Sequence, residues 1–256
     1  MGSSMTMTNA GTGPAPDVIG ADLKRTARTT GLLYLGFFIA GISGFMVVRA
    51  QLFAADAQST LTNLMEHDSL ARVGIALELG IVLAQALTAA WFYRLFRSVD
   101  TFAAGSIVVF GMVNAVAIMG SAALLATALD AAGDASLAGA GDAAATVQLL
   151  YVASGHLWGV AAVFFGLWLI PMGWLVVHSR WLPRPLGWIL IAGGVGYLVS
   201  AFVSYLVPNA DLVTQLLTVP ATIGELWIMG YLIIVGVRVR DHGPAPRGGG
   251  RAFRAR

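Results

Sequence analysis

Six long apolar runs divide this chain, and short segments that hold most of its charged residues separate them. The runs are comparable to the roughly 20 helical residues that cross the hydrocarbon core of a bilayer. The pattern predicts transmembrane helices at about residues 29–48, 72–93, 102–129, 150–177, 186–207 and 213–237. We therefore expect an all-α fold, a polytopic transmembrane helical bundle of six spans, over residues 24–240.

The two ends of the chain have a different composition from the bundle. Residues 1–23 are rich in Gly, Ser, Thr, Ala and Pro, and residues 241–256 are rich in Arg and Gly. Neither segment has apolar periodicity, so both are expected to be disordered. The first apolar run exceeds the roughly 7–15 residues of a signal-peptide core, which favours a retained first helix.

Composition supports lipid as the outer solvent. The chain is 57% hydrophobic and only 11% charged, whereas a soluble domain carries about 25% charged residues. It has no cysteine, which excludes disulfides and thiolate metal sites.

The distribution of positive charge predicts the orientation in the membrane. Of the 15 Lys and Arg residues, 13 lie in the amino-terminal flank, the second and fourth loops and the carboxyl tail. The other loops hold Arg49, Arg72 and most of the acidic residues. By the positive-inside rule, both termini are cytoplasmic and the protein is a multi-pass protein of the inner (plasma) membrane. The stretch 56–68 is expected to hold a short surface helix, and 130–142 a flexible connector.

Ionisable residues within the apolar runs are the candidates for function. A charge at mid-bilayer costs at least ~2.5 kcal/mol, so such a residue requires a partner or a role. Glu78, His156 and Glu225 stand within the second, fourth and sixth runs, and Asn114 within the third. Arg49 ends the first run, within reach of Glu78 or of water. We expect these five residues to form an outward-facing polar cluster.

Each candidate also has a purely structural interpretation. Glu78 paired with Arg49 would serve architecture as readily as function. His156 within a helix is more often hydrogen-bonded packing, and Asn114 is expected to bond a neighbouring helix. Glu225 is the strongest candidate, because no Lys or Arg shares its run at that depth.

Small residues are expected to serve helix packing. Gly155 and Gly159 form a GxxxG pair, and several glycines crowd the fifth run. Small residues let helix backbones approach closely in lipid.

Signs of catalysis, metal binding and nucleic-acid binding are weak. Only one of four histidines lies within a run, so no ligand set for haem or zinc exists and no cofactor is expected. Ser154 and His156 are two residues apart, which points their side chains away from each other on a helix. The Arg-rich tail is expected to meet anionic membrane lipids rather than nucleic acid.

Several stretches resemble a bacterial family of integral membrane proteins called domain of unknown function 4386. The likeness extends from about residue 26 to 237. It rests on RTTGLLYL at 28–35, on the segment from Val163 to Leu198 with its FFG and Pro-x-x-Leu-Gly elements, and on Gly224-Glu225-Leu226. The resemblance implies six spans and no particular activity.

Three functions remain open from the sequence. The first is a small transporter or permease-like protein that moves a small lipophilic or polar solute through the polar cluster. Few polar residues lie in the inner half of the bundle, which weakens this hypothesis. The second is an intramembrane enzyme that uses Glu78, His156 and Glu225 on a lipid, although the sequence leans away from an enzyme. The third is a non-catalytic protein that binds a partner in the membrane.

Overall fold

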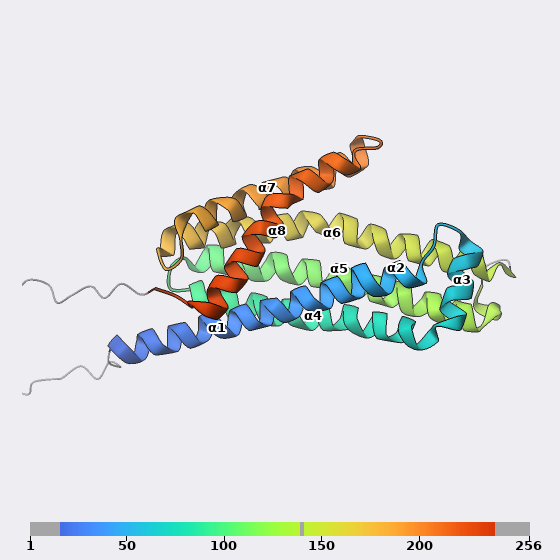
Figure 1. Cartoon of the computed structure of the whole chain (residues 1–256), viewed down its shortest axis with the longest axis horizontal. Helices are drawn as coiled ribbons and strands as arrows, with labels where there is room; N and C mark the ends of the chain where they lie inside the picture. The colour runs from blue at the N-terminus through green and yellow to red at the C-terminus, as the bar shows by residue number, and fades with distance from the viewer. Residues whose placement is uncertain (1–15, 139–140, 239–256) are drawn as a thin grey trace, which may run out of the picture.

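The computed structural model describes residues 16–138 and 141–238, and these residues form helices without any strand. Six helices are long and apolar enough to cross a membrane (Figure 1). The expected all-α bundle of six spans is therefore confirmed. In chain order the elements are α1 (Pro16–Gly41), the π-helix η1 (Ile42–Val48), α2 (Arg49–Leu52), α3 (Ala57–Glu66), α4 (Asp68–Phe96), α5 (Thr101–Gly133), the 3₁₀-helix η2 (Ala135–Leu137), α6 (Ala143–Ser179), α7 (Arg184–Leu206) and α8 (Asp211–Ile234).

The first helix begins earlier than the sequence suggested. Residues 16–23, expected to be part of a disordered lead, form the first turns of α1. Proline is well tolerated at the start of a helix, because the first backbone N–H groups have no partner within it. The helix then continues through η1 and α2 to Leu52. Residues 1–15 and the expected tail at 241–256 lie outside the described residues.

Two segments that connect spans are also partly helical: the one between the first and second spans and the one between the third and fourth. The short helix expected within 56–68 is present as α3. The prediction of a flexible connector over 130–142 is wrong for its first residues, because α5 continues to Gly133 and η2 follows. Alanine, the best helix former, makes up much of 122–132 and explains this continuation.

Aspartates fix where several helices begin. The carboxylates of Asp56, Asp100 and Asp142 each accept a hydrogen bond from the backbone N–H three residues later, at 2.8, 3.0 and 2.9 Å. These contacts satisfy one of the free N–H groups in the first turns of α3, α5 and α6.

Consecutive spans pack side by side, and α8 returns to cross α1 (Figure 1). The crossing lies near the end where the described chain begins and finishes. Toward the other end, the α7–α8 hairpin diverges from α1 and α6 (Figure 1). This divergence shapes the larger cavity described below.

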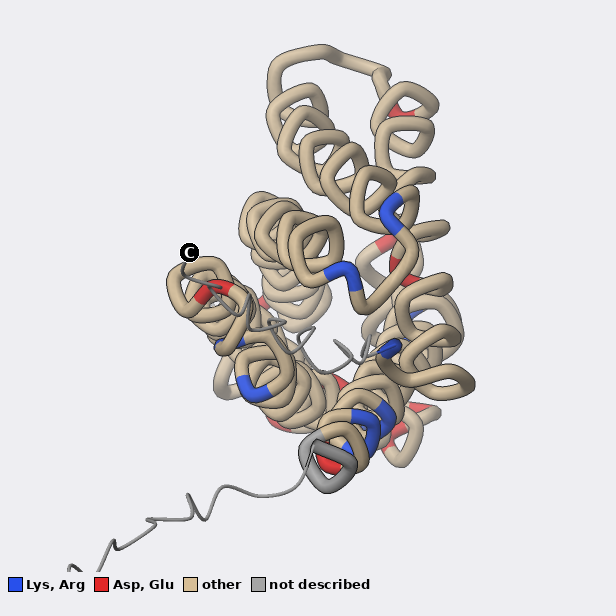
Figure 2. Tube along the Cα trace, turned by 90° about the vertical axis from the view of Figure 1, so that its left-hand side faces the viewer, with Lys and Arg blue, Asp and Glu red and all other residues tan. Residues whose placement is uncertain are grey.

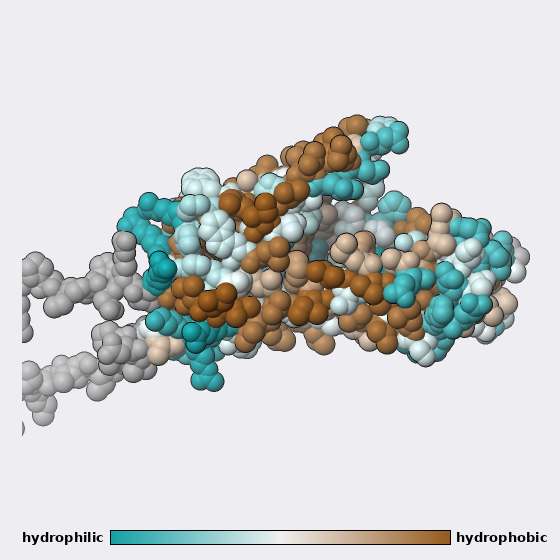
Figure 3. All heavy atoms as spheres, in the orientation of Figure 1, coloured by the Kyte–Doolittle hydropathy of each residue, from teal (hydrophilic) through white to brown (hydrophobic). Residues whose placement is uncertain are grey.

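Charge distinguishes the two ends of the bundle. We call the end that carries Lys24, Arg97 and Arg180 the basic end, and Figure 2 looks onto it. The opposite, acidic end carries Asp56, Asp68 and Asp134. Between them, apolar side chains cover the middle of the surface (Figure 3), including Leu83, which is 66% exposed. An apolar belt between two polar ends is the surface that a lipid bilayer requires.

Glycines bring α6, α7 and α8 into close contact. A Cβ placed at Gly173 of α6 would lie 2.4 Å from the carbonyl oxygen of Gly187 on α7, and one at Gly166 would lie 2.7 Å from that of Gly194. The GxxxG pair does not make such a backbone seam, since a Cβ at Gly155 would meet nothing within 4 Å and one at Gly159 would meet only the Tyr205 side chain, at 3.0 Å. Small residues therefore do serve packing, but about two to four turns further along α6 than the GxxxG pair.

Candidate functional site

The polar residues within the spans are divided between two cavities. The larger one, which we call the Glu225 pocket, has a volume of about 300 Å³. The smaller one, the Arg49–Glu78 cavity, measures about 20 Å³. Of the five candidate residues, Glu225 and Asn114 line the first, Arg49 and Glu78 line the second, and His156 lines neither.

The Glu225 pocket is mainly apolar and aromatic. Its aromatic lining residues are Phe37, Phe38, Phe45, Trp158, Phe165 and Tyr197. They come from α1, η1, α6 and α7, while α8 adds Thr222 and Glu225 and α5 adds Asn114. A pocket with apolar walls and a few convergent polar groups is the usual form of a small-molecule site.

The pocket has its mouth where α8 and the first span diverge. Ile42 and Met46 of η1 line it and are 42% and 69% exposed. Thr222 of α8 is exposed on the other side. In the space-filling view the diverging hairpin stands away from the body of the bundle (Figure 3). The exposed lining residues therefore put the opening of the pocket on the side of the bundle, between the first span and α8.

Tyr34 holds the carboxylate of Glu225. The Tyr34 hydroxyl donates a hydrogen bond to Glu225 Oε1, which joins α1 to α8. Both side chains are buried, at 1% and 6% exposure. The Tyr34 ring lies edge-on against Phe92 and Trp168, so packing fixes its direction. Sequence reasoning missed Tyr34, since a tyrosine within an apolar run does not reveal its partner.

Asn114 connects two spans beside the pocket. Its Nδ2 donates to Oε1 of Gln85 on α4 at 3.0 Å, and both side chains are buried. This is the interhelical bond expected from an amide within a membrane span. Because Asn114 also lines the pocket, the same amide is available to a bound molecule.

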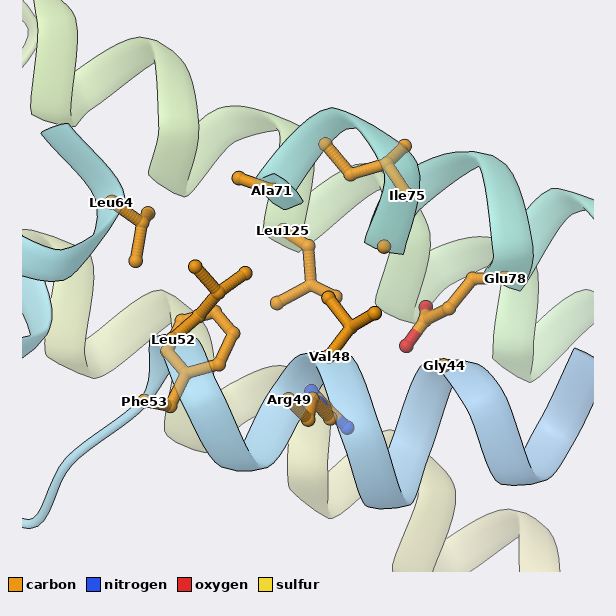
Figure 4. Close-up of a pocket in the computed structure, with 11 residues that line it drawn as sticks. Gly44, Val48, Arg49, Leu52, Phe53, Leu64, Ala71, Ile75, Glu78 and Leu125 are labelled. Atoms are coloured by element: carbon orange, nitrogen blue, oxygen red, sulfur yellow. The ribbon is translucent and has the colours of Figure 1, made fainter. Parts of the chain in front are cut away.

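Arg49 and Glu78 face a common cavity near the acidic end (Figure 4). Arg49 was expected at the end of its span, yet its side chain is only 6% exposed and its guanidinium donates to Ser154 Oγ on α6. Among the described residues, no ion pair within 4.0 Å joins Arg49 to Glu78. Arg49 Nε and Glu78 Oε2 are both buried without a hydrogen-bond partner there.

The size of this cavity fits a single water. A water molecule requires about 10–15 Å³ of such space and two or more polar partners. The cavity of about 20 Å³ provides the space, and Arg49 Nε and Glu78 Oε2 are the polar atoms that need partners. The arrangement suits a pair of opposite charges bridged by one water molecule. Such a pair would stabilise the packing of the first span against α4.

Trp158 connects the two cavities. Its indole N–H donates to Glu78 Oε1 at 3.3 Å, while its ring lines the Glu225 pocket. Phe45 also serves both sites, because its ring lines the pocket and lies 5.4 Å from the Arg49 guanidinium carbon. Neither role was visible in the sequence, since an aromatic residue in an apolar run normally only packs.

His156 stands apart from the other candidates. Its side chain is exposed, and Nδ1 lies 3.5 Å from the hydroxyl of Tyr205 on α7. Ser154, two residues earlier, is buried and turned toward Arg49, as the helical spacing predicts. The structure therefore brings together neither a Ser–His pair nor the expected single cluster of five residues. Within the described ranges, no group of three His, Cys, Asp or Glu side chains is arranged to hold a metal ion.

Comparison with known proteins gives a family and no activity. No curated protein and no solved structure matches this chain. A family model described as Domain of unknown function (DUF4386) matches residues 29–236, which contain five of the spans in full and most of the first. The chain belongs to this family.

Proposed function

We propose that this protein binds a small lipophilic solute in the Glu225 pocket and moves it, as a small permease-like protein. One observation carries this proposal: a cavity of about 300 Å³ with apolar walls, the polar side chains of Asn114, Thr222 and Glu225, and a mouth at exposed residues on the side of the bundle. A solute dissolved in the bilayer reaches such a mouth without crossing the polar ends of the bundle.

The geometry gives less support to the other functions. An intramembrane enzyme built on Glu78, His156 and Glu225 requires these groups at one reaction centre, and they are divided among two cavities and an exposed helix face. A purely non-catalytic partner protein has no need for a cavity that holds a buried carboxylate. A binding and transport role uses the pocket as it is.

The orientation that we propose follows from charge. The basic end carries nearly all described Lys and Arg residues of the loops, so it faces the cytoplasm in the plasma membrane. With this orientation, the pocket mouth at Ile42 and Met46 of η1 lies in the half of the first span that is nearer the extracellular side. Reporter fusions after Arg97 should report a cytoplasmic location, and fusions after Ser136 an external one. The opposite result would reverse the proposed orientation.

The functional proposal is tested with three small aromatic solutes of different charge. These are the cation benzyltrimethylammonium, its uncharged isostere neopentylbenzene and the anion phenylacetate. The full-length protein is placed in lipid nanodiscs, and empty nanodiscs give the partition background. We expect saturable binding of at least one solute, and faster flux of a charged binder into proteoliposomes than into liposomes without protein. Absence of saturable binding by all three would overturn the proposal.

A further inference from the structure

The Glu225 pocket contains one carboxyl group and no basic side chain. None of its lining side chains is Lys, Arg or His. Glu225 Oε1 accepts from Tyr34, and among the described residues no cationic side chain lies within 4.0 Å of its carboxylate. The sixth span offers none either, because no Lys or Arg occurs between Asp211 and Ile234.

A carboxylate in this environment is costly without a positive partner. Within a membrane, acidic side chains pair with one another, with cations or with hydrogen-bond donors. Tyr34 supplies one neutral donor to one oxygen. The second oxygen has no donor among the described residues, and Glu225 lines the pocket. A cation that enters the pocket would therefore meet an oxygen that no part of the described bundle uses.

The aromatic walls favour the same charge. Six aromatic rings line the pocket. The faces of such rings attract organic cations, and cages of aromatic residues are a known solution for quaternary ammonium groups. An anion would meet the Glu225 carboxyl group and would be repelled by any ring face that it contacts, so neither feature of the pocket favours it.

From these features we propose that the solute of the Glu225 pocket is a lipophilic organic cation, such as an amine or a quaternary ammonium group attached to an apolar body. Glu225 supplies the counter-charge, the aromatic walls hold the ammonium and its apolar substituents, and Asn114 is the neutral polar contact. This inference rests on the proposed function, and it narrows the solutes of that site to one class.

The test compares benzyltrimethylammonium with neopentylbenzene, which has the same shape and no charge. In nanodiscs, the cation should bind wild type about tenfold or more tightly than the neutral isostere. Glu225→Gln, whose amide oxygen still accepts from Tyr34, should lose most of the cation affinity and keep that for neopentylbenzene. Glu66→Gln, an exposed site on α3, removes the same charge away from the pocket and should leave both affinities unchanged.

A second variant keeps the test decisive if Glu225→Gln does not fold. Phe45→Leu removes one aromatic wall at the partly exposed mouth and should weaken the cation more than its neutral isostere. Equal affinities of the two solutes for wild type, or tighter binding of phenylacetate, would overturn the cation assignment while leaving the proposed function intact. If no solute binds, both proposals fail.

Discussion

Trp158 of α6 donates its indole N–H to Glu78 of α4 at 3.3 Å, while its side chain also lines the pocket of Glu225. Trp158 therefore contacts Glu78 and lines the same pocket as Glu225, the other buried acidic side chain among the described residues. A molecule that displaces the Trp158 ring in the pocket also disturbs the hydrogen bond to Glu78. Trp158 is therefore the residue through which binding in the pocket would affect Glu78.

The bond between Tyr34 and Glu225 should contribute measurably to stability. Tyr34→Phe leaves Glu225 without its only donor among the described residues, which should cost about 1–3 kcal/mol of unfolding free energy. Tyr231→Phe is the matched control, because the buried Tyr231 hydroxyl has no hydrogen-bond partner in the structure. Thermal and denaturant unfolding in detergent measure both variants. Equal stability of the two variants would show that the Tyr34 hydroxyl is dispensable.

The contact between α6 and α7 should not tolerate even one added methyl group without a loss of stability. Gly173→Ala places Cβ 2.4 Å from the Gly187 carbonyl oxygen, so the helices must separate and the melting temperature should fall. Gly155→Ala has open space and should be neutral or stabilise by up to about 1 kcal/mol through helix propensity. A larger loss at Gly155 than at Gly173 would mean that the GxxxG pair, and not the Gly173 seam, packs this bundle.

Arg49 and Glu78 should depend on each other. Glu78→Leu leaves the buried guanidinium without its counter-charge and should cost about 3–5 kcal/mol, whereas the Arg49→Leu/Glu78→Leu double variant should recover much of that loss. Arg72→Leu breaks an exposed pair with Asp68 and should cost no more than about 1 kcal/mol. Unfolding free energies of wild type, Arg49→Leu, Glu78→Leu and the double variant give the coupling. Strict additivity of the two Leu substitutions would refute the interaction.

The start of α3 should respond to acid. Asp56 accepts from the backbone N–H of Ser59, and this hydrogen bond holds the pKa of the carboxyl below its ordinary value. The bond therefore stabilises α3 at pH values above the unfolded pKa of about 3.9 and is lost as the pH falls through the lower folded value. Amide hydrogen exchange in α3 should speed up at low pH after correction for intrinsic rates. Asp56→Asn, which also caps a helix, should abolish this pH dependence.

The six spans could be predicted because lipid imposes a simple requirement on composition. Every stretch that crosses the bilayer must be apolar and about 20 residues long, and this chain satisfies it six times. The positions of the helix ends were harder to predict. Residues 16–23 and 130–133 were expected to be non-helical, but each segment extends a long helix. Extension of an existing helix does not require a new nucleation step.

The candidate site was only partly visible, because pairing within the membrane depends on helix rotation and order. Glu225, Glu78, Arg49 and Asn114 could be selected by polarity alone. Their division between two cavities depends on which face of each helix points inward, and runs that are apolar on all sides do not encode this. Tyr34 and Trp158 were missed for the same reason, and the exposure of His156 could not be predicted for that reason either.

Filling the Glu225 pocket with a side chain tests the central claim most directly. Ala162 of α6 lines the pocket, whereas Val160 of the same helix is 57% exposed and does not line it. Saturable binding of the three aromatic solutes is measured for Ala162→Trp and Val160→Trp in nanodiscs, after thermal unfolding has shown that both variants are folded. We expect Ala162→Trp to abolish the binding that wild type shows and Val160→Trp to retain it. Undiminished binding by folded Ala162→Trp would contradict the account, because the solute would then occupy some other part of the molecule.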